Sequence, residues 1–233
     1  MGERFKGKVV IVTGAARGLG AAIAEAFLDE GASVALADSD AVALNETVHR
    51  LHEAAPARVI PVQTDVTNET SVQRMVQATL DLYKRLDVFV SAEGAVRRGE
   101  VTEFNTDDWR RVIERNLVGY FLCAKHAARA LKAHGGGAIV QVDSVVGRSS
   151  GAGNSALAAA LAGGLGLTRS LAIELAPYGI RVNAVCPAEL PDVPPSDDAT
   201  DHEADTAAAT DAVLYLVSDD ASQVTGQALT VGE

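Results

Sequence analysis

Short apolar runs alternate with longer amphipathic stretches along most of the chain. Runs rich in β-branched residues and bounded by glycine or polar residues are typical of strands buried on both faces. They predict strands at 8–13, 33–38, 58–63, 86–92, 138–143, 180–186 and 227–231. The stretches between them have apolar residues at helical spacing. They predict helices at 21–29, 44–55, 72–83, 107–132, 157–174 and 207–217.

Strands that alternate with helices predict an α/β fold with a parallel sheet and helices on both of its faces. Right-handed crossovers make such a sheet doubly wound, so we expect a Rossmann-type fold with seven strands. The chain has no internal repeat and no linker-like segment. We therefore expect residues 1–233 to form a single domain.

Composition narrows the classes of function. The 233 residues have a net charge of −11, and no basic stripe is available for nucleic acid. Cys123 and Cys186 lie in apolar runs, which predicts buried, reduced thiols, and no cluster of Cys and His indicates a metal. No signal peptide is evident, and no apolar run of membrane-spanning length is free of a charge or a glycine break. We expect a cytoplasmic protein without a membrane partner.

An acidic segment at 191–205 interrupts the pattern near the end. It contains three prolines, six acidic residues and neither Lys nor Arg. Such a segment buries little apolar surface, so we expect a solvated loop. An interaction surface is the alternative.

A glycine-rich loop joins the first predicted strand to the first predicted helix. Gly14, Gly18 and Gly20 allow a tight turn, and the loop also holds Arg17. Backbone N–H groups at the start of the helix can then bind a pyrophosphate. A glycine loop in this strand–helix context predicts a dinucleotide site.

Asp38 ends the second predicted strand, eighteen residues after Gly20. A carboxylate there accepts hydrogen bonds from both adenosine ribose hydroxyls and repels a 2′-phosphate, which favours NAD over NADP. The alternative interpretation is that Asp38 caps the helix that follows.

Several motifs together resemble the short-chain dehydrogenase/reductase family over nearly the whole chain: TGAARGLG, QTDVTN, DSVVG and LAIELAPYGIRVNAVCP. The resemblance implies that Asp65 and Val66 contact the adenine. It also implies that Ser144 hydrogen-bonds the substrate carbonyl and that Asn116 holds a water in a proton relay.

The chain departs from this family at the residues that carry its chemistry. The family places a Tyr thirteen residues after the Ser and a Lys four residues later, where this chain has Leu157 and Leu161. Leucine exchanges no proton, so the resemblance implies negligible activity for the chain alone. We then expect Ser144 and Asn116 to be vestigial, with Ser144 capping a turn and Asn116 bonding backbone.

Other departures affect the cofactor and the substrate lid. Glu93 replaces a small residue after the fourth strand, where its charge would repel a pyrophosphate or crowd the ribose. The substrate-lid region is short, at about 188–206. Binding of NAD is therefore doubtful, and the dinucleotide residues could themselves be vestigial.

The helices at 107–132 and 157–174 are intact, and the second is apolar nearly all round, which favours a partner chain. These features predict a non-catalytic subunit that supports or regulates an intact NAD-dependent alcohol or hydroxyacyl-CoA dehydrogenase of the same family. One alternative is an NAD(H)-binding regulatory module. Another is an NAD-dependent oxidoreductase with atypical acid–base residues, or an engineered inactive variant.

Overall fold

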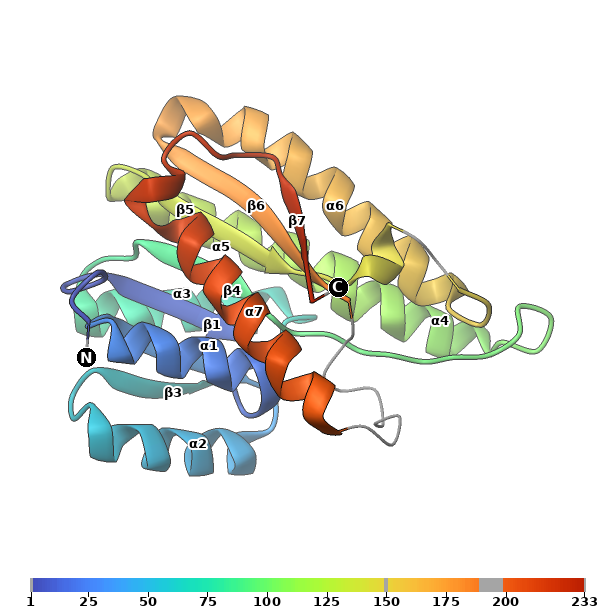
Figure 1. Ribbon diagram of the computed structural model, residues 1–233, viewed down its shortest axis with the longest axis horizontal. Coiled ribbons are helices and arrows are strands. Elements are labelled where there is room, and N and C mark those ends of the chain that lie inside the picture. The colour runs from blue at the N-terminus through green and yellow to red at the C-terminus, as the bar shows by residue number, and fades with distance from the viewer. Residues whose placement is uncertain (1, 149–150, 189–198, 233) are drawn as a thin grey trace.

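The computed structural model describes residues 2–148, 151–188 and 199–232, except for the side chains of residues 54 and 199–205. Its strands form one parallel sheet in the order β3-β2-β1-β4-β5-β6-β7 (Figure 1). The strands are β1 Val9–Thr13, β2 Ser33–Asp38, β3 Val59–Gln63, β4 Val88–Ser91, β5 Gly137–Val142, β6 Ile180–Pro187 and β7 Ala228–Val231. The predicted α/β fold with a seven-stranded parallel sheet is confirmed.

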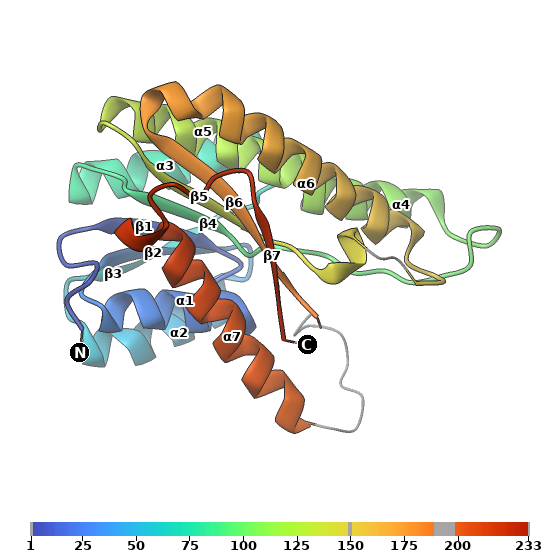
Figure 2. The same ribbon diagram turned by 45° about the horizontal axis from the view of Figure 1, so that its top comes forward.

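Helices cover both faces of the sheet, as Figures 1 and 2 show. One face is covered by α1 Gly18–Asp29, α2 Ala41–Ala54 and α7 Ala199–Val217. The other is covered by α3 Glu69–Tyr83, α5 Gly119–Ala133 and α6 Ser155–Leu175. Helix α4, Thr106–Ile113, packs against α6 beyond the sheet.

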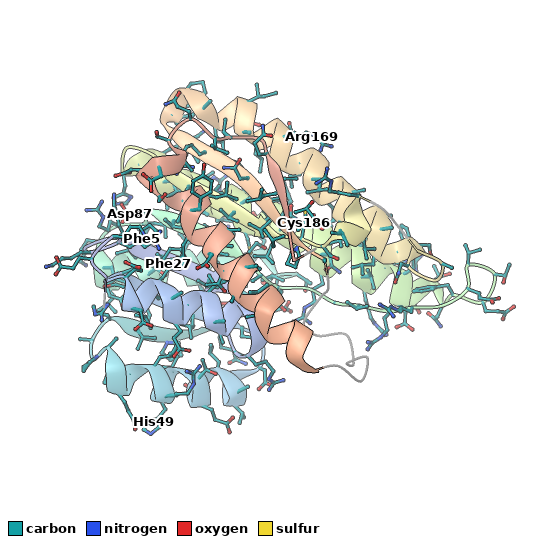
Figure 3. All side chains as sticks on the ribbon, in the orientation of Figure 1. Phe5, Phe27, His49, Asp87, Arg169 and Cys186 are labelled. Atoms are coloured by element: carbon teal, nitrogen blue, oxygen red, sulfur yellow. The ribbon has the colours of Figure 1, made fainter. Side chains whose placement is uncertain are left out.

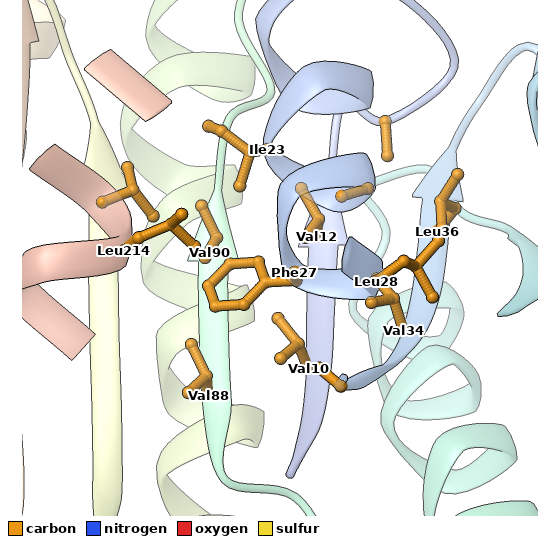
Figure 4. Close-up of a cluster of buried hydrophobic side chains, with 14 of the residues drawn as sticks. Val10, Val12, Ile23, Phe27, Leu28, Val34, Leu36, Val88, Val90 and Leu214 are labelled. Carbon is orange, nitrogen blue, oxygen red and sulfur yellow. The ribbon is translucent and has the colours of Figure 1, made fainter. Parts of the chain in front are cut away.

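The two faces hold separate apolar clusters because side chains alternate along each strand. Val10 and Val12 of β1 pack toward α1, whereas Ile11 packs toward α3 and α5. Phe27 of α1 is fully buried in the first cluster, beside Val88 and Val90 (Figure 4). The Phe5 ring meets it edge-on at 5.1 Å between centroids, and Figure 3 labels both rings.

The predicted helix at 107–132 is not a continuous α-helix, because a π-helical turn interrupts it in the middle. It consists of α4, a π-helical turn at Glu114–Val118 and α5. Asn116 lies in this turn, and its Nδ2 donates to the Val112 carbonyl at 2.8 Å. π-Helical turns are common at functional sites. Asn116 is therefore a candidate residue of such a site.

Helix α7 begins at Ala199, eight residues before the predicted start. The prediction of a loop at 191–205 is therefore wrong for residues 199–205, which continue the helix. Residues 189–198, which hold most of the predicted lid, lie outside the described residues.

Helix α6, with the turn that follows it, is long and apolar enough to cross a membrane. It packs along β6 and α4 and buries Leu157, Leu161 and Leu165 against them. Its inner face therefore accounts for much of its apolarity. Ile173 on its outer face is 80% exposed, and a partner chain over α4 to α6 stays a prediction.

Candidate active site

A cavity of about 220 Å³ lies at the carboxyl ends of β1, β4 and β5. The strand order reverses between β1 and β4, and ligands of doubly wound sheets bind at such a switch point. The cavity is lined by Gly14, Arg17, Leu19, Gly20, residues 91–97, Asn116, residues 141–143, Leu157 and Leu161. Residues from five separate parts of the chain thus meet in one place.

The glycine loop is closed tightly around the start of α1. Gly14 has a φ of +65°, and a Cβ there would lie 2.5 Å from the Ala92 carbonyl oxygen. A Cβ on Gly20 would lie 2.2 Å from the Gly14 carbonyl oxygen. No side chain caps the N-terminus of α1 at Arg17. The helix start can therefore receive an anion such as a pyrophosphate.

Asp38 connects the glycine loop to the end of β2. Its Oδ2 accepts from the Ala16 amide at 3.1 Å, and its Oδ1 accepts from the Asp40 amide at 3.0 Å. The N-cap of α2 is Asp40, which accepts from the Ala43 amide at 3.1 Å. The alternative interpretation of Asp38 as a helix cap is therefore wrong. The Arg17 guanidinium also pairs with Asp40, at 2.7 Å.

Asp65 and Val66 are not among the residues that line the cavity. Asp65 Oδ1 accepts from the amide and the hydroxyl of Thr67, at 3.0 and 2.7 Å. Val66 is buried, and its Cγ2 would lie 2.9 Å from a Cβ on Gly119. The adenine contacts implied for these two residues stay predictions.

Glu93 forms an ion pair that sequence reasoning missed. Its carboxylate is almost fully buried and accepts from Arg115 Nε at 2.7 Å. Arg115 also donates to Ser39 Oγ at 2.9 Å. Burial raises the pKa of Glu93, and Arg115 opposes this shift. The pair offsets the negative charge that we expected to repel a pyrophosphate.

We expect Arg115→Ala to lower the free energy of unfolding by about 1–3 kcal/mol, because it leaves the Glu93 carboxyl buried without its cation. The double variant with Glu93→Ala should recover part of this loss. Chemical denaturation of Arg115→Ala, of Glu93→Ala and of the double variant measures the coupling.

Arg110→Ala is the matched control, since the Arg110 pair with Asp107 is exposed. We expect it to change stability by less than about 0.5 kcal/mol. Equal effects of the two arginine variants would contradict the buried pair.

The side chains of Ser144 and Asn116 both form hydrogen bonds with backbone groups. Ser144 Oγ accepts from the Val146 amide at 3.3 Å and caps the 3-10 turn at Val145–Gly147. Asn116 Nδ2 donates to the Ala95 carbonyl at 2.8 Å, and its Oδ1 accepts from the Ala95 amide at 3.2 Å. Asn116 lines the cavity, whereas Ser144 is not among the lining residues.

Leu157 and Leu161 form an apolar wall of the cavity, on the first turns of α6. They are 2% and 5% exposed and pack with Val112 and Ala156. Neither side chain can donate or accept a proton.

Sequence reasoning also missed Asp143, which follows β5 directly. Its side chain is buried, and its Oδ1 accepts from the Ser144 amide at 2.7 Å. Among the described residues its Oδ2 has no hydrogen-bond partner. Burial raises the pKa of this carboxyl to about 7. An acidic residue at the end of a buried apolar strand was the signal that could have found it.

The thiols of Cys123 and Cys186 are free and buried, as predicted, and Figure 3 labels Cys186. Burial raises the pKa of both, so neither is a ready thiolate. Over residues 2–148, 151–188 and 199–232, no group of three His, Cys, Asp or Glu side chains is placed to hold a metal ion.

Comparisons with known proteins agree with this fold. A family model described as short chain dehydrogenase matches residues 8–194. The chain is 40% identical to a cis-4-hydroxycyclohexanecarboxylate dehydrogenase of Sinomonas cyclohexanicum, covering 99% of the chain and 97% of the relative. It is 33% identical to a 3-oxoacyl acyl-carrier-protein reductase of Thermotoga maritima, covering 98% and 97%. A crystal structure of a short chain dehydrogenase from Mycobacterium smegmatis superposes with a TM-score of 0.89, at 32% identity, and covers 99% and 94%.

These relatives correct the expectation of a non-catalytic subunit. Relatives that align over nearly their whole length are named as dehydrogenases and reductases. The expectation rested mainly on Leu157 and Leu161, supported by Glu93 and the short lid region, and assumed that no other side chain in the cavity could exchange a proton. Asp143, which lines the same cavity, removes that assumption.

Proposed function

Because the chain belongs to the short-chain dehydrogenase family, we propose that it is an NAD-dependent oxidoreductase that interconverts a secondary alcohol and a ketone with atypical acid–base residues. The observation that carries this proposal is the cavity at the strand ends. There the glycine loop, an apolar wall and an ionisable side chain meet.

The glycine loop fits a dinucleotide, since Gly14 and Gly20 leave no room for a Cβ and α1 starts without a side-chain cap. Backbone groups at Gly18 and Gly20 would hold the pyrophosphate, and Asp38 would accept from the adenosine ribose. When bound, the nicotinamide accepts the hydrogen of the alcohol carbon with both electrons of the broken bond. The family binds nicotinamide dinucleotides, and the choice of NAD rests on the charge of Asp38.

The proposed substrate is a compact, mostly apolar hydroxy acid. Leu157, Leu161 and Val96 supply apolar surface to the cavity, and Arg97 supplies a cation that can pair with a carboxylate. The relative from Sinomonas cyclohexanicum is named for a hydroxylated cyclohexane carboxylate, which has these two features. Such compounds are the first substrates to assay.

We expect the pure protein to bind NADH more tightly than NADPH and to oxidise cis-4-hydroxycyclohexanecarboxylate with NAD. In Asp38→Ala, loss of a hydrogen-bonding carboxylate should weaken NADH binding about tenfold or more. NADPH binding should weaken less, because the same change also removes the repulsion between the Asp38 carboxylate and the 2′-phosphate of NADPH. Fluorescence titration of the two reduced dinucleotides and absorbance of the NADH formed measure both effects.

Asp29→Ala is the control, because Asp29 is an exposed residue at the end of α1. It should leave both affinities unchanged. Tight dinucleotide binding without turnover of any hydroxycyclohexanecarboxylate would favour the NAD(H)-binding regulatory module instead. Neither binding nor turnover would overturn the proposal.

A further inference from the structure

In the described part of the chain, two carboxyl groups of the cavity have incomplete hydrogen bonding, those of Asp143 and Glu93. Glu93 has an unpartnered Oε2 but is ion-paired with Arg115, whereas Asp143 has no ion pair in the same part of the chain. The Asp143 side chain is 1% exposed, and the Ser144 amide donates to its Oδ1 at 2.7 Å. Its Oδ2 is buried and lacks a hydrogen-bond partner among the described residues. A buried acceptor without a partner destabilises the folded protein, because no hydrogen bond compensates for its loss of water. Buried polar groups without a partner are uncommon in native proteins, and a catalytic role is one of the explanations for them.

Asp143 lies beside the two leucines that replace the family's Tyr and Lys. A Cβ on Gly147 would lie 3.1 Å from Asp143 Oδ1 and 2.8 Å from Leu161 Cβ, so these groups converge on one point. Leu157 and Leu161 line the same cavity as Asp143. The carboxyl therefore lies at the end of the cavity from which the usual proton-exchanging groups are missing.

The other ionisable side chains that line the cavity are less suited to exchange a proton. Glu93 is ion-paired with Arg115, and the guanidinium groups of Arg17 and Arg97 are hydrogen-bond donors that have no acceptor atom. In the described part of the chain, Asp143 is thus the carboxyl of this cavity without an ion pair.

The groups that face Asp143 from other elements are neutral around pH 7. Tyr120 of α5 and Cys186 of β6 interact with it electrostatically, and burial raises the pKa of both. Arg148, on the turn after Ser144, acts on Cys186. Burial raises the pKa of Asp143 itself to about 7, against the opposing bond from the Ser144 amide. A general acid or base works best with a pKa near the working pH.

We propose that Asp143 is the catalytic acid–base residue of this cavity and exchanges the hydroxyl proton of the substrate through its unpartnered Oδ2. This inference rests on the proposed function. In the oxidation the O–H and C–H bonds of the alcohol break and the C=O bond forms. The hydroxyl proton goes to the Asp143 carboxylate and then to water, and the hydrogen of the carbon would leave with both bonding electrons as a hydride to the oxidised dinucleotide of the proposed function. In the reduction the carbonyl carbon would receive the hydride from the reduced dinucleotide, and the protonated Asp143 carboxyl returns a proton to the carbonyl oxygen.

Asp143→Asn tests the proposal, because it keeps the size of the side chain and an acceptor for the Ser144 amide but removes the exchangeable proton. We expect kcat to fall about 10²–10⁴-fold in both directions, while NADH affinity changes less than about twofold. In the wild type, the oxidation rate should rise and the reduction rate should fall with an inflection near pH 7. This inflection should be absent from the variant.

A second readout needs neither cofactor nor turnover. Carbon-13 NMR of labelled aspartate carboxyls in the free protein should show one signal that titrates near pH 7. The signal should persist in Asp211→Asn, which makes the same change at an exposed site on α7, and should vanish in Asp143→Asn. Asp211→Asn should also keep the wild-type kcat.

The outcomes separate the two proposals. If the wild type turns over and Asp143→Asn matches it, the role of Asp143 is wrong and the proposed function stands. If the wild type gives no turnover, the proposed function fails and this inference with it. Should Asp143→Asn not fold, an active wild type without an inflection near pH 7 would by itself overturn the role of Asp143.

Discussion

As the pH rises from about 4 to about 7, we expect Asp143 to remove about 4 kcal/mol from the free energy of unfolding. Burial raises the pKa of this carboxyl to about 7 in the folded protein, against about 3.9 in the unfolded chain. The folded state therefore holds the proton more tightly. The stabilisation that this proton gives to the folded state is complete below the unfolded-state pKa of about 3.9. It is lost as the pH rises through the folded-state pKa of about 7.

The Asp143 contribution is isolated by comparing the wild type with Asp143→Asn in urea at several pH values. The difference in stability between the two proteins should change by about 1.4 kcal/mol per pH unit between the two pKa values. At about pH 8 the variant should be the more stable protein. Asp211→Asn is the control, and its difference from the wild type should stay small throughout. A constant difference between the wild type and Asp143→Asn would show that the carboxyl titrates normally.

Replacement of Ile23 by Ala is expected to lower the free energy of unfolding by about 2–5 kcal/mol. Ile23 is fully buried on α1, and Figure 4 shows it near Val90 of β4, in the cluster that also holds Leu214 of α7. The shortened side chain leaves a cavity that close-packed neighbours fill only in part. Chemical denaturation monitored by circular dichroism measures the change.

Ile173→Ala is the matched control, since it makes the same substitution in a helix at a side chain that is 80% exposed. We expect a change within about 0.5 kcal/mol. Equal losses at Ile23 and Ile173 would contradict the placement of Ile23 in the core. A loss at Ile173 that depends on protein concentration would instead reveal a partner on α6.

Most of the fold could be predicted from local patterns. β-branched runs such as those around Ile11 and Val182 located every strand of the sheet to within about two residues, because buried parallel strands are apolar on both faces. The π-helical turn around Asn116 could not be found in this way. Around this turn Gly119 lies close to Val66 and the Asn116 side chain bonds the backbone of Ala95, and both contacts join residues that are distant in sequence.

The candidate site could be predicted in part. The glycine loop with Gly14 and Gly20 was identified by its motif. That Leu157 and Leu161 belong to the site followed from the number of residues that separate them from Ser144 in the sequence. The conclusion that the chain is non-catalytic was wrong. It treated a missing motif as a missing activity, although acid–base chemistry depends on which ionisable group reaches the cavity rather than on one spacing.

The sequence by itself determined the order of strands and helices, the glycine loop and the apolar character of α6, since each depends on residues close together in the chain. Only the tertiary structure decided that Arg115 offsets the charge of Glu93 and that Asp143 lies unpaired beside Leu161. The physical reason is that the pKa of a carboxyl depends on the solvent it loses and the charges it meets on folding. Those neighbours come from β5, α6 and the π-helical turn, which are distant in sequence.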